Sequence, residues 1–132
     1  MKKAFTALVF IFAACNTGSS YRKAEDAQDA GREFIRASLN GDYDRARFYM
    51  LPDSVNELLL NKWKKDYHQL NETAREQYKD ADILPINIQS LNDSVTSYTY
   101  ANSYKKDTTT IRIIRKNGDW LVDFKEILND KR

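Results

Sequence analysis

Apolar residues in the first half of the chain recur every three or four positions, which is the spacing of one face of a helix. From Ala24 to Leu39 this stripe consists of Ala27, Ala30, Gly31, Phe34, Ile35 and Ser38. Asn40 and Gly41 predict its end, because glycine readily adopts the left-handed conformation found after a helix C-terminus. Asp42 is then expected to cap a short second helix from Tyr43 to about Tyr49.

Pro52 interrupts the helical pattern before a third apolar stripe begins. Ser54 and Glu57 have the spacing of a capping box, so a helix is predicted to start there. Its apolar side consists of Val55, Leu58, Leu59, Trp63, Tyr67 and Leu70. Thr73 and Glu76 form a second capping-box pattern. We therefore expect a break near Asn71 and a fourth helix after it.

After Asp82 the pattern changes to short runs rich in β-branched and aromatic residues, which is typical of strands. Four strands are predicted, at 83–91, 95–104, 108–115 and 120–125. Helices followed by a run of antiparallel strands indicate an α+β domain with the helices on one face of the sheet.

The last predicted hairpin has a definite register. Asn117 and Gly118 suit a two-residue turn, which places Lys116 opposite Asp119. Counting back from the turn, one face pairs Arg115 with Trp120, Ile113 with Val122 and Ile111 with Phe124. The other face carries the opposite charges of Lys116–Asp119 and Arg112–Asp123, and Ile114 opposite Leu121. Such a ribbon is half-buried, and the Arg115 guanidinium is expected to stack on Trp120.

The N-terminus has a pattern of its own, with Lys2 and Lys3 before an apolar run, 4–14, in which only Thr6 is polar. This run is shorter than the ~20 residues that span a bilayer and is typical of a secretory signal. Its end, 12–15 (Phe-Ala-Ala-Cys), resembles the lipobox of bacterial lipoproteins, although phenylalanine stands where leucine is usual. In those proteins the cysteine is acylated and becomes the first residue of the mature chain.

We therefore expect a lipoprotein signal peptide at 1–14, a lipid-anchored flexible tether at 15–23 and a single domain at 24–132. The alternatives are an ordinary signal peptide that leaves Cys15 as a free thiol and an uncleaved membrane anchor. The predicted location is the bacterial cell envelope, on the periplasm-facing side of the outer membrane, because asparagine rather than aspartate follows Cys15.

Composition limits the function further. A chain of 132 residues accommodates one domain, and its one cysteine excludes a disulfide framework or a multi-cysteine zinc site. The net charge of +2 comes from Lys2 and Lys3, which the predicted signal peptide contains. Without them the acidic and basic residues balance, so no nucleic-acid partner is expected.

One resemblance covers most of the predicted domain. Phe34, Leu39, the Gly41-Asp42-Tyr43 turn, Ala46 and the run from Lys116 to Asp123 resemble small bacterial lipoproteins of an uncharacterised family. That family is placed in the nuclear-transport-factor-two-like, or cystatin-like, superfamily. The resemblance implies a cone-shaped domain in which a curved four-stranded sheet wraps around a long helix, often leaving a pocket. Some such proteins bind small ligands, some are isomerases or dehydratases, and many only dimerise, so the fold alone does not define a function.

Aromatic residues are the candidate binding groups. Tyr98, Tyr100 and Tyr104 are predicted to share one face of the second strand. If that face lines the cone, an apolar ligand pocket would consist of Tyr49, Trp63, Tyr98, Tyr100, Tyr104 and Trp120. The alternatives are that these rings fill the core or form a dimer surface.

Candidate catalytic groups are few. His68 lies in a charged helical stretch and lacks the further ligands of a metal site, so we expect no metal and no cofactor. Asp123 is a potential buried acid, but the hairpin register assigns it to a pair with Arg112.

We predict a non-enzymatic ligand-binding or protein-interaction module, with a second copy or another envelope protein as partner. The alternative is a small isomerase, dehydratase or hydrolase that uses an acid or His68 in the cone.

Overall fold

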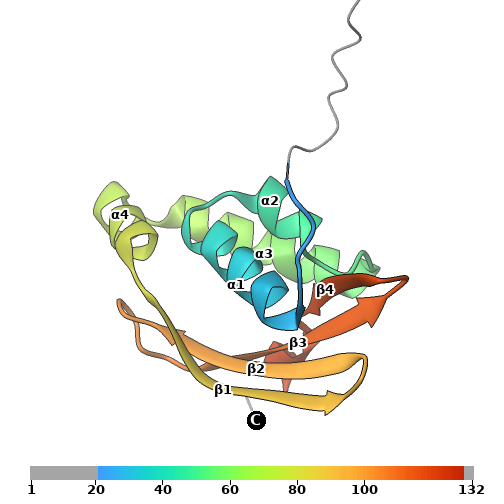
Figure 1. Ribbon diagram of the computed structural model, residues 1–132. Helices are drawn as coiled ribbons and strands as arrows, with labels where there is room; N and C mark the ends of the chain where they lie inside the picture. The colour runs from blue at the N-terminus through green and yellow to red at the C-terminus, as the bar shows by residue number, and fades with distance from the viewer. Residues whose placement is uncertain (1–20, 130–132) are drawn as a thin grey trace, which may run out of the picture.

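The computed structural model describes residues 21–129, in which a helical layer covers one face of a sheet (Figure 1). Four α-helices come first in the chain, followed by four strands and a 3-10 helix. The helices are α1 (Ala27–Leu39), α2 (Tyr43–Phe48), α3 (Ser54–Gln69) and α4 (Glu72–Asp80). The strands are β1 (Ile83–Asn92), β2 (Val95–Asn102), β3 (Thr109–Lys116) and β4 (Asp119–Asp123), and the 3-10 helix η1 spans Lys125–Leu128. This confirms the predicted α+β class.

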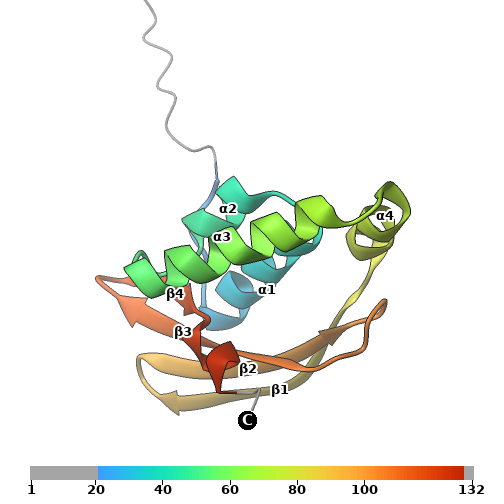
Figure 2. The same ribbon diagram turned by 180° about the vertical axis from the view of Figure 1, so that it is seen from behind.

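The sheet is fully antiparallel with the order β1-β2-β3-β4. Its β3–β4 register pairs Ile113 with Val122 and Arg115 with Trp120, as the hairpin pattern predicted. The Arg115 guanidinium lies over the Trp120 ring, 5.6 Å from its centroid. Figures 1 and 2 show that the sheet curves upward toward α4, so that α1 lies within its concave side and α3 lies beyond α1.

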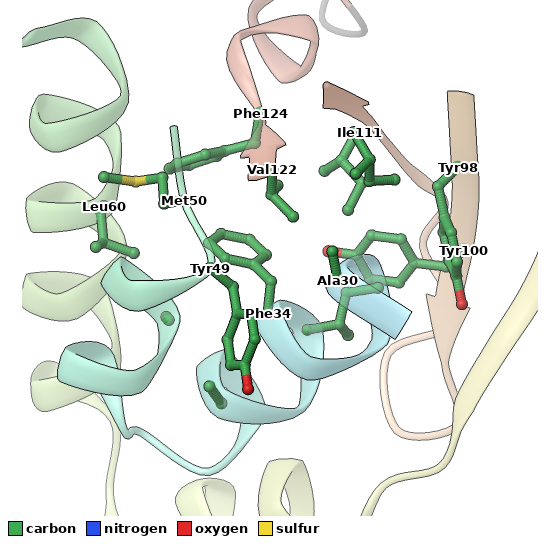
Figure 3. Close-up of a cluster of buried hydrophobic side chains, with 14 of the residues drawn as sticks. Ala30, Phe34, Tyr49, Met50, Leu60, Tyr98, Tyr100, Ile111, Val122 and Phe124 are labelled. Carbon is green, nitrogen blue, oxygen red and sulfur yellow. The ribbon is translucent and has the colours of Figure 1, made fainter. Parts of the chain in front are cut away.

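The core lies between α1 and the sheet (Figure 3). Phe34 of α1, Ile111 and Ile113 of β3 and Phe124 after β4 are each less than 2% exposed. Burying one such side chain contributes about 1.5–3 kcal/mol. The segment after α2 closes the far edge of the sheet, since the Leu51 N–H donates to the Val122 carbonyl at 2.8 Å.

The two predicted N-cap residues, Ser54 and Thr73, were wrong by one and two positions. Asp53, rather than Ser54, caps α3 through a hydrogen bond from the Asn56 N–H, and Asn71 caps α4 in the same way. Asp and Asn compete well for the N-cap position, so the residue before a capping-box pattern can take the role. The predicted break near Asn71 is confirmed.

The buried face of α3 also differs from the prediction. Leu58 is 70% exposed and Val55 40% exposed, whereas Asn56, Leu59 and Leu60 are buried. The helix is rotated because Asn56 is completely buried against the end of β4, where its side chain accepts a hydrogen bond from the Phe124 N–H at 3.3 Å.

Lys116 lies opposite Asp119 and Arg112 opposite Asp123, as predicted, but Asp119 and Arg112 form their ion pairs with other residues. Asp119 pairs with Lys23 at 3.2 Å, and Arg112 pairs with Glu126 at 3.1 Å. Asp123 instead accepts a hydrogen bond from Asn56. The reason is that η1 brings Glu126 beside β3, and β4 is an edge strand that other segments approach.

Three residues of the predicted tether, Tyr21–Lys23, are described by the structure and pack on the domain. Arg22 donates to the carboxylate of Asp29 at 2.6 and 3.0 Å, and the Tyr49 hydroxyl donates to the Arg22 carbonyl at 2.7 Å. The Tyr21 ring contacts Phe48, with 5.5 Å between centroids. The domain therefore includes Tyr21–Lys23, which we call the lead segment. Cys15 and the predicted signal peptide lie outside the described residues.

Within residues 21–129, no helix has both the length and the apolar character needed to cross a membrane.

Candidate ligand pocket

A cavity of about 290 Å³ lies where the C-terminal ends of α1 and α3 approach β2. Most of its lining is aromatic or aliphatic, and the polar groups are few. The lining residues are Ile35, Ser38, Leu39, Tyr43, Trp63, Asp66, Tyr67, Leu70, Tyr78, Tyr100, Asn102 and Thr109.

Packing holds the rings from α2 and α3 in place. The Tyr43 and Tyr67 rings meet nearly edge-on, 5.9 Å apart, and the Tyr43 hydroxyl donates to the Trp63 carbonyl at 3.2 Å. The other side of Trp63 contacts Phe34 and Phe124, at 6.2 and 5.1 Å. One wall of the cavity is thus continuous with the core.

Gly41 makes room for Tyr67. Its φ is +74°, and a Cβ at this position would lie 2.4 Å from Cε1 of the Tyr67 ring. Any other residue would therefore displace the ring and also carry the strain of a positive φ.

The wall formed by α4 is held by backbone contacts. Arg36 of α1 donates to the Lys79 and Ala81 carbonyls, at 3.2 and 2.8 Å, which fixes the end of α4. The Tyr78 ring packs edge-on against Tyr104 at 4.9 Å.

Two phenol groups of the lining are protonated at neutral pH. Burial raises the pKa of Tyr100, although a hydrogen bond with Thr109 partly offsets this effect. Burial also raises the pKa of Tyr43, and Tyr67, Asp66 and Tyr78 act in the same direction. Both hydroxyls are therefore neutral hydrogen-bonding groups rather than bases, and each already has one partner: the Trp63 carbonyl for Tyr43 and Thr109 for Tyr100.

Among residues 21–129, Asp66 is the one charged residue in the lining. Its side chain is 55% exposed and pairs with Lys62, one helical turn earlier, at 2.7 Å. The carboxylate is thus on the solvent side of the cavity.

Two of the six residues predicted for the pocket, Trp63 and Tyr100, do line this cavity. Tyr98 instead fills the core, 1% exposed, in a position where a Cβ on Gly31 would lie 3.1 Å from its ring. Tyr104 supports Tyr78 from outside the lining. Tyr98 and Tyr100 share one face of β2, as predicted, but the prediction was wrong for Tyr104, because β2 ends at Asn102 and Tyr104 lies in the turn that follows. Whether a ring on the shared face fills the core or borders the cavity depends on the helix that covers it.

Tyr49 and Trp120 lie elsewhere. They border a separate cleft of about 90 Å³ beside the lead segment. Burial raises the pKa of Tyr49, and its hydroxyl already binds the Arg22 carbonyl. These two residues therefore connect the lead segment to β4 rather than line the larger cavity.

The two candidate catalytic groups also lie outside the cavity lining. His68 is exposed and outside the lining, and its ring lies nearly perpendicular to that of Tyr67, with 5.9 Å between the centroids. Asp123 is engaged by Asn56 and by Lys125. Within residues 21–129, no group of three or more acidic, histidine or cysteine side chains has the arrangement of a metal site.

Three lining aromatics, Tyr43, Tyr67 and Tyr78, were not among the predicted pocket residues. Tyr67 was identifiable in part, since it follows Trp63 by four residues on the same helical face. Tyr43 and Tyr78 come from other helices, and no local pattern relates them to the cavity.

A solved structure with a similar fold is that of an NTF-2-like protein of unknown function from Shewanella oneidensis MR-1. It aligns with a TM-score of 0.50 and 14% sequence identity, over 72% of this chain and 89% of that chain. A similarity at this identity shows the fold alone, and on this basis the chain has an NTF-2-like fold. Neither a protein-family model nor a curated protein matches the sequence.

Proposed function

We propose that this protein is a non-enzymatic binding module of the bacterial cell envelope, anchored by lipid at Cys15, whose cavity holds a small and mostly apolar ligand. The observation that carries the proposal is the lining of that cavity. Five aromatic rings and three aliphatic side chains surround about 290 Å³, with a few polar groups between them. This composition is typical of sites for small molecules.

The size of the cavity limits the ligand. A dry cavity of about 150 Å³ accepts benzene, so this cavity suits a ligand of up to about two rings. Besides their bonds with the Trp63 carbonyl and Thr109, the Tyr43 and Tyr100 oxygens can accept hydrogen bonds, which would orient such a molecule.

The polar groups favour binding over catalysis. General-base catalysis needs a side chain that accepts a proton near neutral pH and lies in a site that excludes water. The one carboxylate of the described lining, Asp66, is more than half exposed and already paired with Lys62. The raised pKa values of Tyr43 and Tyr100 keep these groups neutral.

The proposed anchor rests on the N-terminal sequence pattern, and the lead segment indicates which part of the domain it would bring near the membrane. Tyr21 contacts Phe48 at the end of α2, where the described chain begins beside that helix (Figure 1). Five residues lie between Cys15 and Tyr21, so the two Cα atoms can be at most about 20 Å apart at full extension. A lipid at Cys15 would thus place the end of α2 near the bilayer, whereas Tyr43 at the beginning of α2 lines the cavity.

Fluorescence of Trp63 tests the binding proposal. The chain has two tryptophans, so a Trp120→Phe variant reports on Trp63 in the cavity wall. The full chain with Cys15→Ser, purified without detergent, would be titrated with benzyl alcohol. We expect a saturable change in emission and a rise in Tm, since a ligand at 100 times its Kd stabilises the folded state by about 2.7 kcal/mol.

The matched control exchanges the roles of the two tryptophans. A Trp63→Phe variant that retains Trp120 should lose the change in emission and show a smaller rise in Tm, because Trp63 is part of the cavity wall. If neither emission nor Tm responds to benzyl alcohol or to other small apolar molecules, the proposal is wrong.

A further inference from the structure

We infer that the ligand of this cavity is a free organic cation with a quaternary ammonium group, held by the aromatic rings and by Asp66. The inference rests on the proposed binding function and specifies the chemistry of its ligand.

The first argument is the density of aromatic rings. Tyr43, Trp63, Tyr67, Tyr78 and Tyr100 line a single cavity. The face of an aromatic ring is electron-rich and attracts cations, and several rings around one space form the kind of cage that binds quaternary ammonium groups. Neutral apolar ligands do not require this density, because aliphatic side chains bury them equally well.

The second argument is the charge of the lining. Among the described residues, Asp66 carries the only charge there, and no lysine, arginine or histidine lines the cavity. Its partner Lys62 is 65% exposed and one helical turn away. Exposed pairs of this kind contribute little, so an incoming cation can replace the Lys62 ammonium beside the carboxylate.

The electrostatic environment of Tyr43 also favours a cation over an anion. Among the neighbours that raise the pKa of Tyr43 after burial, Asp66 is the group that is charged at neutral pH, so its carboxylate disfavours a further negative charge in this part of the cavity. Two basic groups of the surrounding elements are engaged elsewhere. Lys105 lies over the Tyr104 ring at 5.3 Å, and Arg36 binds two backbone carbonyls of the α4 end.

The third argument distinguishes between kinds of cation. A primary ammonium needs hydrogen-bond acceptors for its N–H groups when it loses its water, whereas a quaternary ammonium has no N–H group and does not. The Ser38 hydroxyl already donates to the Phe34 carbonyl at 2.9 Å, and most of the remaining surface is apolar. A phosphate or carboxylate next to the ammonium would meet Asp66 with no basic residue in the described lining, so a free cation fits better than a zwitterionic headgroup.

Choline and 3,3-dimethylbutan-1-ol provide a direct test, because they have the same shape and differ in the charge at one atom. Calorimetric titration would use the full chain with Cys15→Ser, without detergent. We expect choline to bind about tenfold more tightly than the alcohol. Asp66→Asn should weaken choline binding more than alcohol binding, and Lys62→Gln should strengthen choline binding.

Asp44→Asn is the matched control, because Asp44 is a carboxylate on α2 that is 85% exposed and outside the cavity lining. It should change neither affinity. Equal affinities for choline and the alcohol would overturn the cation assignment and leave the proposed binding function intact. Tighter binding of monomeric dihexanoylphosphatidylcholine than of choline would overturn the assignment of a free cation. If choline, the alcohol and benzyl alcohol all fail to bind, both the assignment and the proposed function are wrong.

Discussion

Gly41 shows how one residue shapes the cavity at a distance in sequence. It ends the turn after α1 with a positive φ and leaves room for the Tyr67 ring of α3. The sequence pattern identified the turn, because Asn-Gly after a helical stripe is a local signal. It gave no sign that a ring would lie against the glycine.

Gly41→Ala should therefore destabilise the fold by about 2–4 kcal/mol, the sum of backbone strain and a displaced ring. Urea unfolding measures this loss. Gly118→Ala is the control, because Gly118 also has a positive φ (+83°) but a Cβ there would have no neighbouring atom within 4 Å. The decrease in unfolding free energy should be larger for Gly41→Ala than for Gly118→Ala, and the difference measures the effect of the displaced Tyr67 ring. Equal decreases would contradict a close contact between Gly41 and Tyr67.

Asp29 is the second residue with an effect that can be measured directly. Hydrogen bonds from Arg22, the Glu25 N–H and Arg32 hold the pKa of Asp29 well below its usual range. The carboxylate is buried, 6% exposed, although it is charged. A lowered pKa means that its contribution to stability is present above about pH 4 and is lost as the pH falls below that value.

Asp29→Asn should cost about 2 kcal/mol at pH 7, because it weakens charge-assisted hydrogen bonds in a buried place. At pH 3 the difference in unfolding free energy between the wild type and Asp29→Asn should be smaller by about 1 kcal/mol. The reason is that the unfolded wild-type chain then takes up a proton at this aspartate. Denaturant unfolding at both pH values tests this. A difference that is the same at pH 3 and pH 7 would contradict the role of the carboxylate charge.

At the scale of elements, the hairpin and α3 differ in how well the sequence predicted them. The β3–β4 register followed from a two-residue turn and strict alternation, both of which act between neighbours in sequence. The buried face of α3 depends on Asn56, which hydrogen-bonds to the Leu51 carbonyl, Asp53, Asp123 and the Phe124 N–H. A polar residue gives no apolar signal, so the predicted stripe included the exposed Leu58 instead.

Asn56→Ala should destabilise the protein by about 2–3 kcal/mol, because it leaves buried backbone groups without partners where α3 joins β4. Thermal or urea unfolding provides the measurement. Asn61→Ala is the matched control, since Asn61 is an exposed residue of the same helix, and we expect less than about 0.5 kcal/mol there. Similar losses for both variants would show that Asn56 does not connect the two elements.

At the scale of the whole molecule, the lead segment determines where an anchored domain would meet the bilayer. Cys15→Ser should remove the added lipid mass and move the protein from the detergent phase to the aqueous phase, because each buried methylene of an acyl chain contributes about 0.8 kcal/mol. Intact-mass analysis and detergent partitioning measure both effects, with Ser19→Ala as the control. An unchanged mass and partitioning would refute the anchor and leave the cavity proposal standing.

The sequence by itself determined the order of helices and strands, the turn positions, the β3–β4 register and the α+β class. These features depend on local propensity and periodicity, which neighbours in the chain decide. Only the tertiary structure decided which aromatic rings fill the core and which line a cavity. Tyr98 and Tyr100 share one face of β2. Tyr98 packs against α1 at Gly31, whereas Tyr100 borders the cavity together with Tyr43 and Tyr67. The difference arises because packing depends on what covers each ring, and that neighbour comes from a distant part of the chain.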